Sequence, residues 1–213
     1  MNKIIAHRGK TTKKIKENTY LAIINAINDK NISGVEFDIR LSKDNKIVII
    51  HDNYINRTSN GSGSVENMSL KELQKYNYGT KDFYQTIPTL DKILKINTNK
   101  ILLIEVKTNK NNKLFANILL KTLKNYNKNN IYITSFNKRF LNYLKKTNLN
   151  IGPLIFNNNI KNKRYNFYIL NYLTFKDKTI KKLKKQNKKI FIWSLIDKDI
   201  DNYNNLYLIK NIN

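Results

Sequence analysis

Residues 34–40, with the sequence GVEFDIR, alternate apolar and charged side chains. Successive side chains of a β-strand point to opposite faces, so a strand here would place Val35, Phe37 and Ile39 on one face. Glu36 and Asp38 would then share the other face. We therefore predict a strand that packs one face against helices and carries two carboxylates side by side on the opposite face.

Short apolar runs recur along the chain, and each is bounded by polar residues. They are three to six residues long and rich in Ile, Val, Tyr or Phe, which is typical of buried strands. The eight runs are Lys3–Ala6, Val35–Ile39, Ile47–Ile50, Ile101–Val106, Ile131–Ile133, Ile151–Phe156, Phe167–Leu170 and Ile190–Leu195.

Segments with helical spacing of apolar residues separate several of these runs. The segment 53–88 differs, because it is long and contains the loop signal Asn60-Gly61-Ser62-Gly63. The predicted helices are Thr19–Asn28, Leu90–Ile96 and Asn112–Tyr126, with shorter ones at Leu70–Leu73, Phe140–Leu144 and Ile180–Leu183.

Buried strands that alternate with helices predict a parallel sheet. Eight such strands close a (β/α)8 TIM barrel, and 213 residues lie near the lower size limit of that fold, ~200. An open doubly wound sheet would carry a glycine-rich phosphate turn after its first strand, where only Gly9 is found. We predict an α/β protein in which residues 1–213 form one barrel domain, with a small insertion at about 53–88 after the third strand.

The composition excludes several classes of protein. The absence of cysteine excludes a disulfide scaffold, a thiolate zinc site and a cysteine nucleophile. The apolar runs are far shorter than the ~20 residues of a membrane span. Only three apolar residues, 4–6, precede the first polar run, which is unlike a signal peptide. We expect a cytoplasmic protein without a transmembrane segment.

The net charge of +25 would by itself suggest a nucleic-acid partner. The excess comes as Lys, together with many Asn and Ile, and these are the residues that A/T-rich codons encode. We therefore predict no specific nucleic-acid partner, and only weak association with an anionic membrane surface. A non-enzymatic nucleic-acid-binding protein is the alternative that the charge alone supports.

Catalytic groups of a barrel lie at the carboxyl ends of its strands. The chemically active residues of this chain fall at such positions. His7-Arg8-Gly9 follows the first run, His51-Asp52 follows the third, and Trp193-Ser194 lies near the end of the eighth. Both histidines of the chain are therefore predicted at the mouth of the barrel, which we define as the end where the strands have their carboxyl ends.

Glu105 and Lys107 end the fourth run with the same alternation as Glu36 and Asp38. Burying neighbouring carboxylates is unfavourable unless a cation compensates them. Mg²⁺ or Ca²⁺ would do so, because both prefer oxygen ligands. We predict a divalent metal site at Glu36, Asp38 and Glu105. The alternative is a salt-bridge cluster of these acids with Lys107 and Arg8.

An unperturbed histidine has a pKa near 6.5, so each imidazole can act as general acid or general base at neutral pH. A metal ion with two histidines and two cations is suited to phosphate-ester chemistry, in which the cations hold phosphoryl oxygens while the imidazoles move protons. We therefore predict catalysis by His7 and His51 beside Arg8 and Lys107. Which histidine is the acid is left open.

The order and spacing of several short motifs resemble those of the glycerophosphodiester phosphodiesterase family, in the phospholipase-C-like phosphodiesterase superfamily. The similarity extends from about residue 3 to residue 196 and is most specific in its first half. The matching stretches are His7-Arg8-Gly9, Glu17-Asn18-Thr19, Glu36-Phe37-Asp38-Ile39, Ser42-Lys43-Asp44, His51-Asp52, Arg57-Thr58, Ile87-Pro88-Thr89-Leu90 and Ile104-Glu105-Val106-Lys107, with weaker echoes at Ser135-Phe136 and Ile192-Trp193-Ser194.

This resemblance implies a (β/α)8 barrel that hydrolyses a glycerophosphodiester, such as glycerophosphocholine, to sn-glycerol 3-phosphate and an alcohol. A sphingomyelinase-D-like or lysophospholipid phosphodiesterase is the nearest alternative. The implied roles are a metal triad of Glu36, Asp38 and Glu105, catalytic His7 and His51, phosphate contacts from Arg8 and Lys107, and a site lining that includes Glu17, Asn18 and Trp193. Trp193 could stack on the substrate glycerol or pack the barrel mouth.

The chain also departs from the family pattern. Lys16 stands where a proline usually precedes Glu-Asn-Thr, and the family's C-terminal Thr-Asp-x-Pro signature is absent. The family's Trp-Thr-Val-Asn is replaced at residues 193–197, which leaves its asparagine position unassigned. None of these differences removes a predicted catalytic group.

Overall fold

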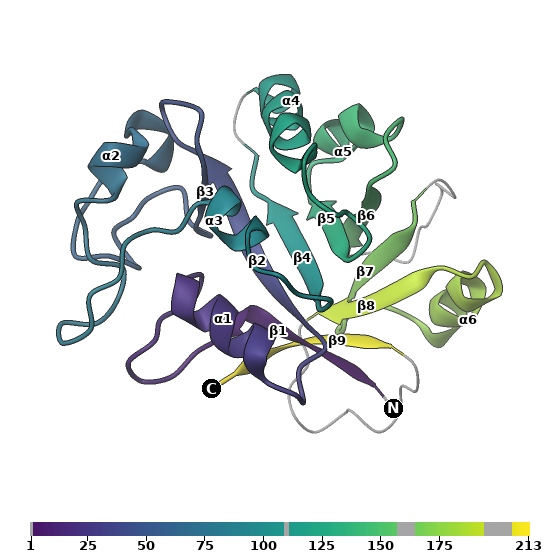
Figure 1. The fold of residues 1–213 in the computed structure, drawn as a ribbon. Coiled ribbons are helices and arrows are strands. Elements are labelled where there is room, and N and C mark those ends of the chain that lie inside the picture. The colour runs from purple at the N-terminus through teal and green to yellow at the C-terminus, as the bar shows by residue number, and fades with distance from the viewer. Residues whose placement is uncertain (1, 109–110, 157–164, 194–205) are drawn as a thin grey trace.

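The computed structural model describes residues 2–108, 111–156, 165–193 and 206–213 (Figure 1). Its centre is a closed parallel barrel, in which β1 pairs with β2 on one side and with β9 on the other. The predicted (β/α)8 architecture is therefore confirmed. The eight barrel strands are β1 (Lys3–Lys10), β2 (Gly34–Leu41), β4 (Ile101–Val106), β5 (Ile131–Ser135), β6 (Asn150–Ile155), β7 (Phe167–Asn171), β8 (Lys189–Trp193) and β9 (Tyr207–Ile212).

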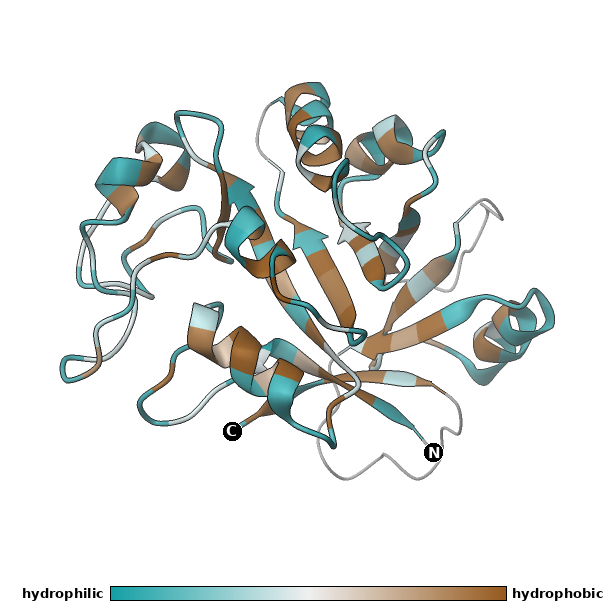
Figure 2. Cartoon of the chain, viewed as in Figure 1, coloured by the Kyte–Doolittle hydropathy of each residue, from teal (hydrophilic) through white to brown (hydrophobic). Residues whose placement is uncertain are grey.

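Helices surround this barrel and pack their apolar faces on it, as the hydropathy colouring in Figure 2 shows. Side chains just before the helices cap them: Thr19 accepts a hydrogen bond from the backbone of Ala22, and Asn111 from that of Leu114. These helices follow the amphipathic segments of the sequence. They are α1 (Tyr20–Asn28), α3 (Leu90–Leu94), α4 (Asn112–Leu123), α5 (Lys138–Leu144) and α6 (Asp177–Lys185).

One predicted barrel strand is wrong. The third apolar run forms β3 (Ile47–Ile49), which pairs antiparallel to β2 and lies outside the barrel. Only residues 42–46 separate the two strands, and Asn45 adopts a φ of 59° in this turn. A parallel connection needs a dozen or more residues. The short connection therefore makes a hairpin.

The eighth barrel strand is β9, which the apolar runs did not reveal. Leu206-Tyr207-Leu208-Ile209 is an apolar run of a length similar to the others, but the eight predicted runs do not include it. The strand count of eight was correct because one false strand replaced one missed strand. The last predicted run also extended to Ser194 and Leu195, which lie outside the described residues.

The alternation along the strands divides the core into two layers. Side chains that point into the barrel include Ile5, Leu103, Tyr132, Phe167 and Phe191, all fully or almost fully buried. The residues between them face the helices and form the larger hydrophobic cluster. Because Glu36, Asp38 and Glu105 share the inward parity, the sheet directs all three carboxylates into the barrel mouth.

The insertion between β3 and α3 has a small apolar core of its own. It contains a 3-10 turn at Val65–Asn67 and the short helix α2 (Leu70–Leu73). Val65, Leu73 and Tyr78 pack there against Ile50 at the end of β3. Ser69 and Glu72 form a capping box at the start of α2. This core fixes the insertion against the hairpin at one side of the mouth (Figure 1).

Replacing Leu208 of β9 should test whether this strand closes the barrel. Leu208 is fully buried against the helical layer, so Leu208→Ala should lower the free energy of unfolding by about 2–5 kcal/mol through lost burial and a cavity. Urea denaturation followed by circular dichroism measures this change. Leu173→Ala is the matched control, because Leu173 is 84% exposed and should change stability by less than about 0.5 kcal/mol. Equal effects of both substitutions would contradict the assignment.

Candidate active site

Three acidic side chains meet at the mouth of the barrel. Glu36 and Asp38 extend from β2, and Glu105 from β4, where it lies directly beside Asp38 in the strand register. One carboxylate oxygen of each residue lies within 4.8 Å of the others. All three residues are buried, with exposed fractions of 3%, 1% and 8%. The predicted metal-binding triad is therefore brought together in space.

The clustering of these acids makes the ionised forms of Glu36 and Glu105 unfavourable. Burial, with the negative charges of Asp38 and Glu105 adding to it, raises the pKa of Glu36 well above its usual range. Burial and Asp38 also raise the pKa of Glu105, although Lys107 partly offsets this. A cation placed among the carboxylates would remove the repulsion.

Two basic side chains reach part of the cluster. The Lys107 ammonium lies 2.5 Å from Oε1 of Glu105 and 3.3 Å from Oδ1 of Asp38, and Nε of Arg8 lies 3.4 Å from Oδ2 of Asp38. The alternative salt-bridge cluster is thus formed in part. It does not satisfy Glu36, because Oε1 of that residue is buried without a hydrogen-bond partner. This unpaired oxygen beside two other carboxylates fits a site for a divalent ion.

The turn at residues 7–9 brings main-chain and side-chain donors to the acids. Arg8 and Gly9 both have positive φ, of 56° and 92°. Gly9 also packs so closely on α1 that a Cβ would lie 2.6 Å from the carbonyl carbon of Ala22, so only glycine fits. In this conformation the Arg8 N–H donates to Oε2 of Glu36 at 3.0 Å.

His7 has a hydrogen-bond partner at each of its two ring nitrogens. Its Nδ1 lies 2.8 Å from the amide oxygen of Asn211, on β9. Since an amide oxygen only accepts, Nδ1 carries the proton. The indole N–H of Trp193 donates to Nε2 at 3.4 Å, which agrees with an unprotonated Nε2. Burial lowers the pKa of His7, so the neutral ring is favoured at neutral pH.

His51 reaches the mouth by a different route from the one predicted. It follows the antiparallel strand β3, not a barrel strand, and the hairpin folds it back toward the acids. The backbone N–H of Ile50 donates to the carbonyl of Asp38 at 3.0 Å, and Arg40 donates to the carbonyl of His51 at 2.8 Å. Nδ1 of His51 lies 2.6 Å from Oδ1 of Asp52. The carboxylate of Asp52 therefore orients the ring.

A chain of charged hydrogen bonds connects Asp52 to the turn at residues 7–9. Arg57 donates to Asp52 at 2.6 Å and to Glu17 at 2.7 Å, and Glu17 accepts from Arg8 at 2.8 Å. The hydrogen bond from Arg57 lowers the pKa of Asp52 to about 2. Burial would raise the pKa of Glu17, but Arg57 and Arg8 hold it below its usual value. The insertion is thereby tied to the first βα turn.

Asn18 supports the triad directly. Its side-chain amide donates to Oδ2 of Asp38 at 2.8 Å, and its oxygen accepts the Asp38 N–H at 3.1 Å. Asn18 has a positive φ of 56°, a conformation that asparagine tolerates better than most residues.

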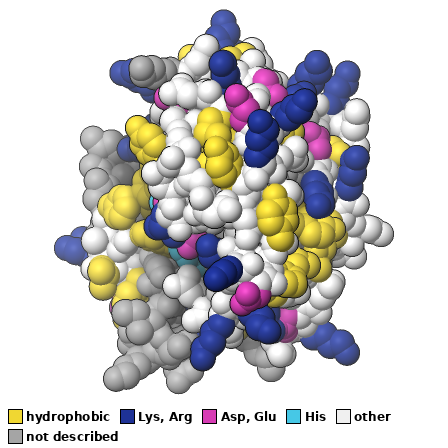
Figure 3. Space-filling model, turned by 90° about the vertical axis from the view of Figure 1, so that its left-hand side faces the viewer, with side chains coloured by type: hydrophobic (Ala, Val, Ile, Leu, Met, Phe, Trp, Pro, Cys, Tyr) yellow, Lys and Arg dark blue, Asp and Glu magenta, His cyan; other side chains and the backbone are white. Residues whose placement is uncertain are grey.

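All ten residues singled out from the sequence lie around the mouth, and Figure 3 shows histidine there between acidic and basic side chains.

Sequence reasoning missed three residues that hold the histidines: Asn211, Asp52 and Arg57. Asp52 and Arg57 lie in stretches that matched the family, but no role followed from the match. Asn211 gave a weaker signal. It comes at the end of the last apolar segment of the chain, so the rule that places active groups at strand ends would have included it if β9 had been recognised.

No helix in the described part of the chain combines the length and the apolar content that a membrane span requires. The described residues also contain one cluster of three or more potential metal ligands, which is the triad at the mouth.

Comparison with known proteins agrees with this fold and site. A curated glycerophosphodiester phosphodiesterase of Caldanaerobacter subterraneus subsp. tengcongensis is 35% identical over 161 residues, which span 71% of this chain and 65% of that relative. The structure of a phosphodiesterase from Oleispira antarctica, in complex with its product sn-glycerol-3-phosphate, superposes with a TM-score of 0.86 at 21% identity, covering 99% of this chain and 93% of that one.

A glycerophosphodiester phosphodiesterase structure from Thermotoga maritima superposes with a TM-score of 0.78 at 25% identity, covering 99% of this chain and 94% of that one. The sequence profile of the Glycerophosphoryl diester phosphodiesterase family matches residues 7–210, from the first histidine of the site to the last barrel strand. The chain belongs to the glycerophosphoryl diester phosphodiesterase family.

Proposed function

We propose that this chain hydrolyses glycerophosphodiesters to sn-glycerol 3-phosphate and an alcohol. The observation that carries the proposal is the buried cluster of Glu36, Asp38 and Glu105, together with two imidazoles that are each held by a hydrogen bond, His7 from β1 and His51 directly after β3. Family membership supports the reaction class, and the product bound by the Oleispira antarctica phosphodiesterase supports the glycerol 3-phosphate product.

Glu36, Asp38 and Glu105 would hold a divalent ion. Carboxylate oxygens are the ligands that Mg²⁺ and Ca²⁺ prefer, and the unpaired oxygen of Glu36 is the group that most needs such a partner. When bound, the ion supplies Lewis-acid stabilisation of charge on a phosphoryl oxygen. Arg8 and Lys107 add two positive charges at the same edge of the site, suited to the remaining phosphoryl oxygens.

His7 acts as the general base. Asn211 holds the proton on Nδ1, and burial keeps the ring neutral, so Nε2 carries a lone pair that is engaged only by the long 3.4 Å hydrogen bond from Trp193. This nitrogen takes the proton of the attacking oxygen. When that oxygen belongs to water, sn-glycerol 3-phosphate forms directly. When it belongs to the neighbouring glycerol hydroxyl, a cyclic phosphate forms first, and a second attack by water opens it to sn-glycerol 3-phosphate. The attacking oxygen forms a bond to phosphorus as the bond between phosphorus and the alcohol oxygen breaks.

His51 acts as the general acid. The carboxylate of Asp52, itself anchored by Arg57, stabilises a positive charge on the imidazole and orients its other nitrogen. That nitrogen gives its proton to the departing alcohol. An open depression of about 420 Å³ beside His51, lined by Arg40, Tyr54 and Arg57 among others, gives the alcohol room to leave.

Removing charge from the metal triad should separate ion binding from folding. In Glu36→Gln the unfavourable buried charge is lost, so the protein without metal should be at least as stable as the parent. Mg²⁺ or Ca²⁺ should raise the melting temperature of the parent, because a ligand present at 100 times its Kd stabilises the folded state by about 2.7 kcal/mol. The same ion should leave the melting temperature of Glu36→Gln unchanged.

Differential scanning calorimetry measures this shift, and Asp91→Asn is its control, because Asp91 is an exposed carboxylate in the first turn of α3. A chelator should abolish activity, and added ion should restore it. Full activity in the chelator, together with a metal-independent melting temperature, would favour the salt-bridge cluster instead.

Loss of either imidazole should abolish most of the activity without unfolding the protein. General acid–base catalysis contributes ~10²–10⁴-fold per group, so His7→Ala and His51→Ala should each reduce kcat by at least that factor. A coupled assay for sn-glycerol 3-phosphate measures turnover of several glycerophosphodiesters. Circular dichroism and the metal-induced shift in melting temperature verify the fold. Near-parental turnover in either variant would refute its role, and faster turnover of lysophospholipid would favour that alternative substrate.

Asn211 should matter because it fixes the tautomer of His7. Asn211→Ala should lower kcat about ten- to a hundredfold with little change in KM. In the parent, the acidic limb of the kcat/KM profile should lie below pH 6.5, because burial lowers the pKa of His7. In Asn211→Ala this limb should move to still lower pH, because the lost Asn211 hydrogen bond raises the pKa of His7 in the parent. Asn213→Ala, two residues further along, is the control. Identical pH profiles for parent and Asn211→Ala would contradict this role.

A further inference from the structure

The exposed hydrophobic side chains are unevenly distributed. Of the eight large ones among the described residues, four lie at the mouth end of consecutive βα units. Three others, Tyr54, Phe83 and Tyr84, belong to the insertion, and only Tyr143 lies elsewhere. We call the first four the apolar rim: Leu114 (38% exposed), Phe136 (43%), Phe156 (49%) and Leu173 (84%).

The two aromatic members of the apolar rim are continuous with the edge of the active site. The rings of Phe136 and Phe156 stack with centroids 5.2 Å apart and planes 15° apart. The rings of Phe156 and Trp193 lie edge to face, with their centroids 6.4 Å apart. Trp193 makes a similar edge contact with the ring of His7. Exposed aromatic rings that stack on one another present an apolar surface to solvent, which is unfavourable unless something covers it.

The same part of the barrel is strongly basic. Residues 106–176, which contain the whole apolar rim, include fourteen Lys and Arg and no Asp or Glu. Exposed Lys113, Lys138, Arg139 and Lys178 occupy the first turns of α4, α5 and α6, at the mouth end of these helices, and Asp177 of α6 is the one acidic residue among these turns. Positive charge at a helix N-terminus opposes the helix dipole, so helix stability does not explain these positions.

We propose that the apolar rim inserts into the headgroup region of a bilayer rich in anionic phospholipid, with the surrounding lysines and arginines bound to lipid phosphates. Apolar side chains surrounded by basic ones match the two requirements of interfacial binding, which are burial of apolar area and attraction to negative lipid. The mouth of the barrel would then open toward the lipid surface.

The charges disfavour other occupants of this face. A second copy of the chain would bring two basic surfaces together, and a two-fold contact would set like charges opposite each other. A nucleic acid would satisfy the cations but not the exposed aliphatic side chains of Leu114 and Leu173, which have no stacking face. A lipid surface satisfies both kinds of side chain.

Vesicle binding tests the proposal without depending on turnover. Trp193 is the single tryptophan of the chain and lies beside Phe156, so its emission should shift to shorter wavelength when the rim enters lipid. We expect binding to phosphatidylglycerol vesicles, much weaker binding to phosphatidylcholine vesicles, and weakening by salt. Co-sedimentation gives the partition coefficient independently of fluorescence.

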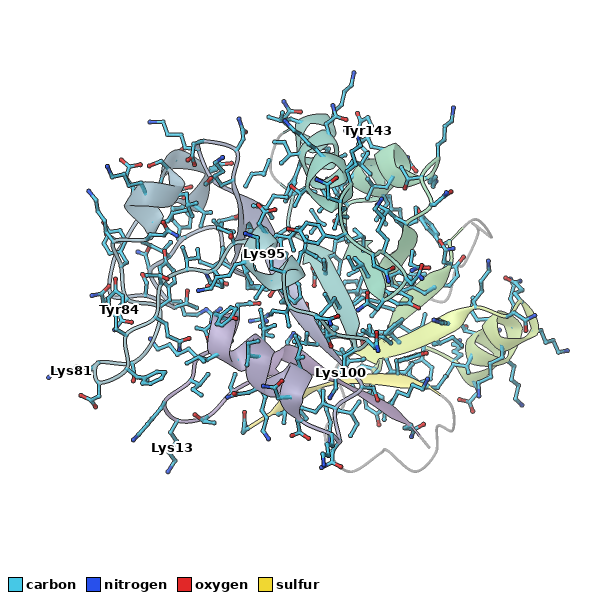
Figure 4. The ribbon with its side chains drawn as sticks, viewed as in Figure 1. Lys13, Lys81, Tyr84, Lys95, Lys100 and Tyr143 are labelled. Carbon is cyan, nitrogen blue, oxygen red and sulfur yellow. The ribbon has the colours of Figure 1, made fainter. Side chains whose placement is uncertain are left out.

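Two variants separate insertion from general electrostatic attraction. The double substitution Phe156→Ser with Leu173→Ser should reduce partitioning into phosphatidylglycerol vesicles at least about tenfold, because it removes buried apolar area but no charge. Tyr143→Ser should not change it, because Tyr143 projects from the outer helical layer near α4 and α5 (Figure 4). Should the double variant fold poorly, Leu173→Ser alone tests the rim, since Leu173 makes little contact with the core.

Several outcomes would overturn the proposal. One is the absence of binding to phosphatidylglycerol vesicles. Another is binding that the rim variants leave unchanged, since this would show attraction by charge alone. A third is self-association in sedimentation velocity that the rim substitutions abolish, which would assign the surface to a second copy. A preference for RNA over vesicles at ~0.15 M salt would assign it to nucleic acid.

Discussion

The repulsion among three buried carboxylates is the constraint around which the rest of this site is arranged. Parallel pairing of β2 with β4 places Asp38 and Glu105 side by side, and the two-residue repeat of β2 adds Glu36 on the same face. In the barrel interior such charges repel one another strongly. Lys107 and Arg8 offset part of this repulsion and leave one oxygen of Glu36 without a partner. The fold thus builds a site that a divalent cation would stabilise.

The two histidines are held by hydrogen-bond partners of different charge. His7 donates to a neutral amide and lies in a largely buried position, which favours the uncharged ring. His51 donates to a carboxylate that Arg57 anchors, which fixes the orientation of the ring and the nitrogen that faces away from Asp52. The two imidazoles therefore have different partners within one site. The environment of each ring, which the sequence alone does not give, distinguishes the proposed base from the proposed acid.

The sequence predicted correctly those features that depend on the alternation of neighbouring side chains along a strand. The inward parity of Glu36, Asp38 and Glu105 follows from a strand repeat of two, and the triad forms as expected. Strand direction depends instead on the length of the connection. Apolar pattern alone therefore assigns the run at 47–50 to the barrel wrongly, because residues 42–46 are too few for a parallel crossover. Contacts across long separations, such as that of Asn211 with His7, depend on barrel closure, so the place of Asn211 after an apolar run does not by itself reveal its partner.

Barrel closure couples the last strand to the first catalytic residue. β9 pairs in parallel with both β1 and β8, and its end places Asn211 against the ring of His7. The family's C-terminal signature is absent from this chain, yet a polar side chain still stands at the end of the final strand. The position needs only a group that accepts a hydrogen bond from a protonated ring nitrogen, and an amide oxygen does so without adding another negative charge to the mouth. An amide there also leaves His7 neutral more readily than a carboxylate would, which suits a base that must be unprotonated before it reacts.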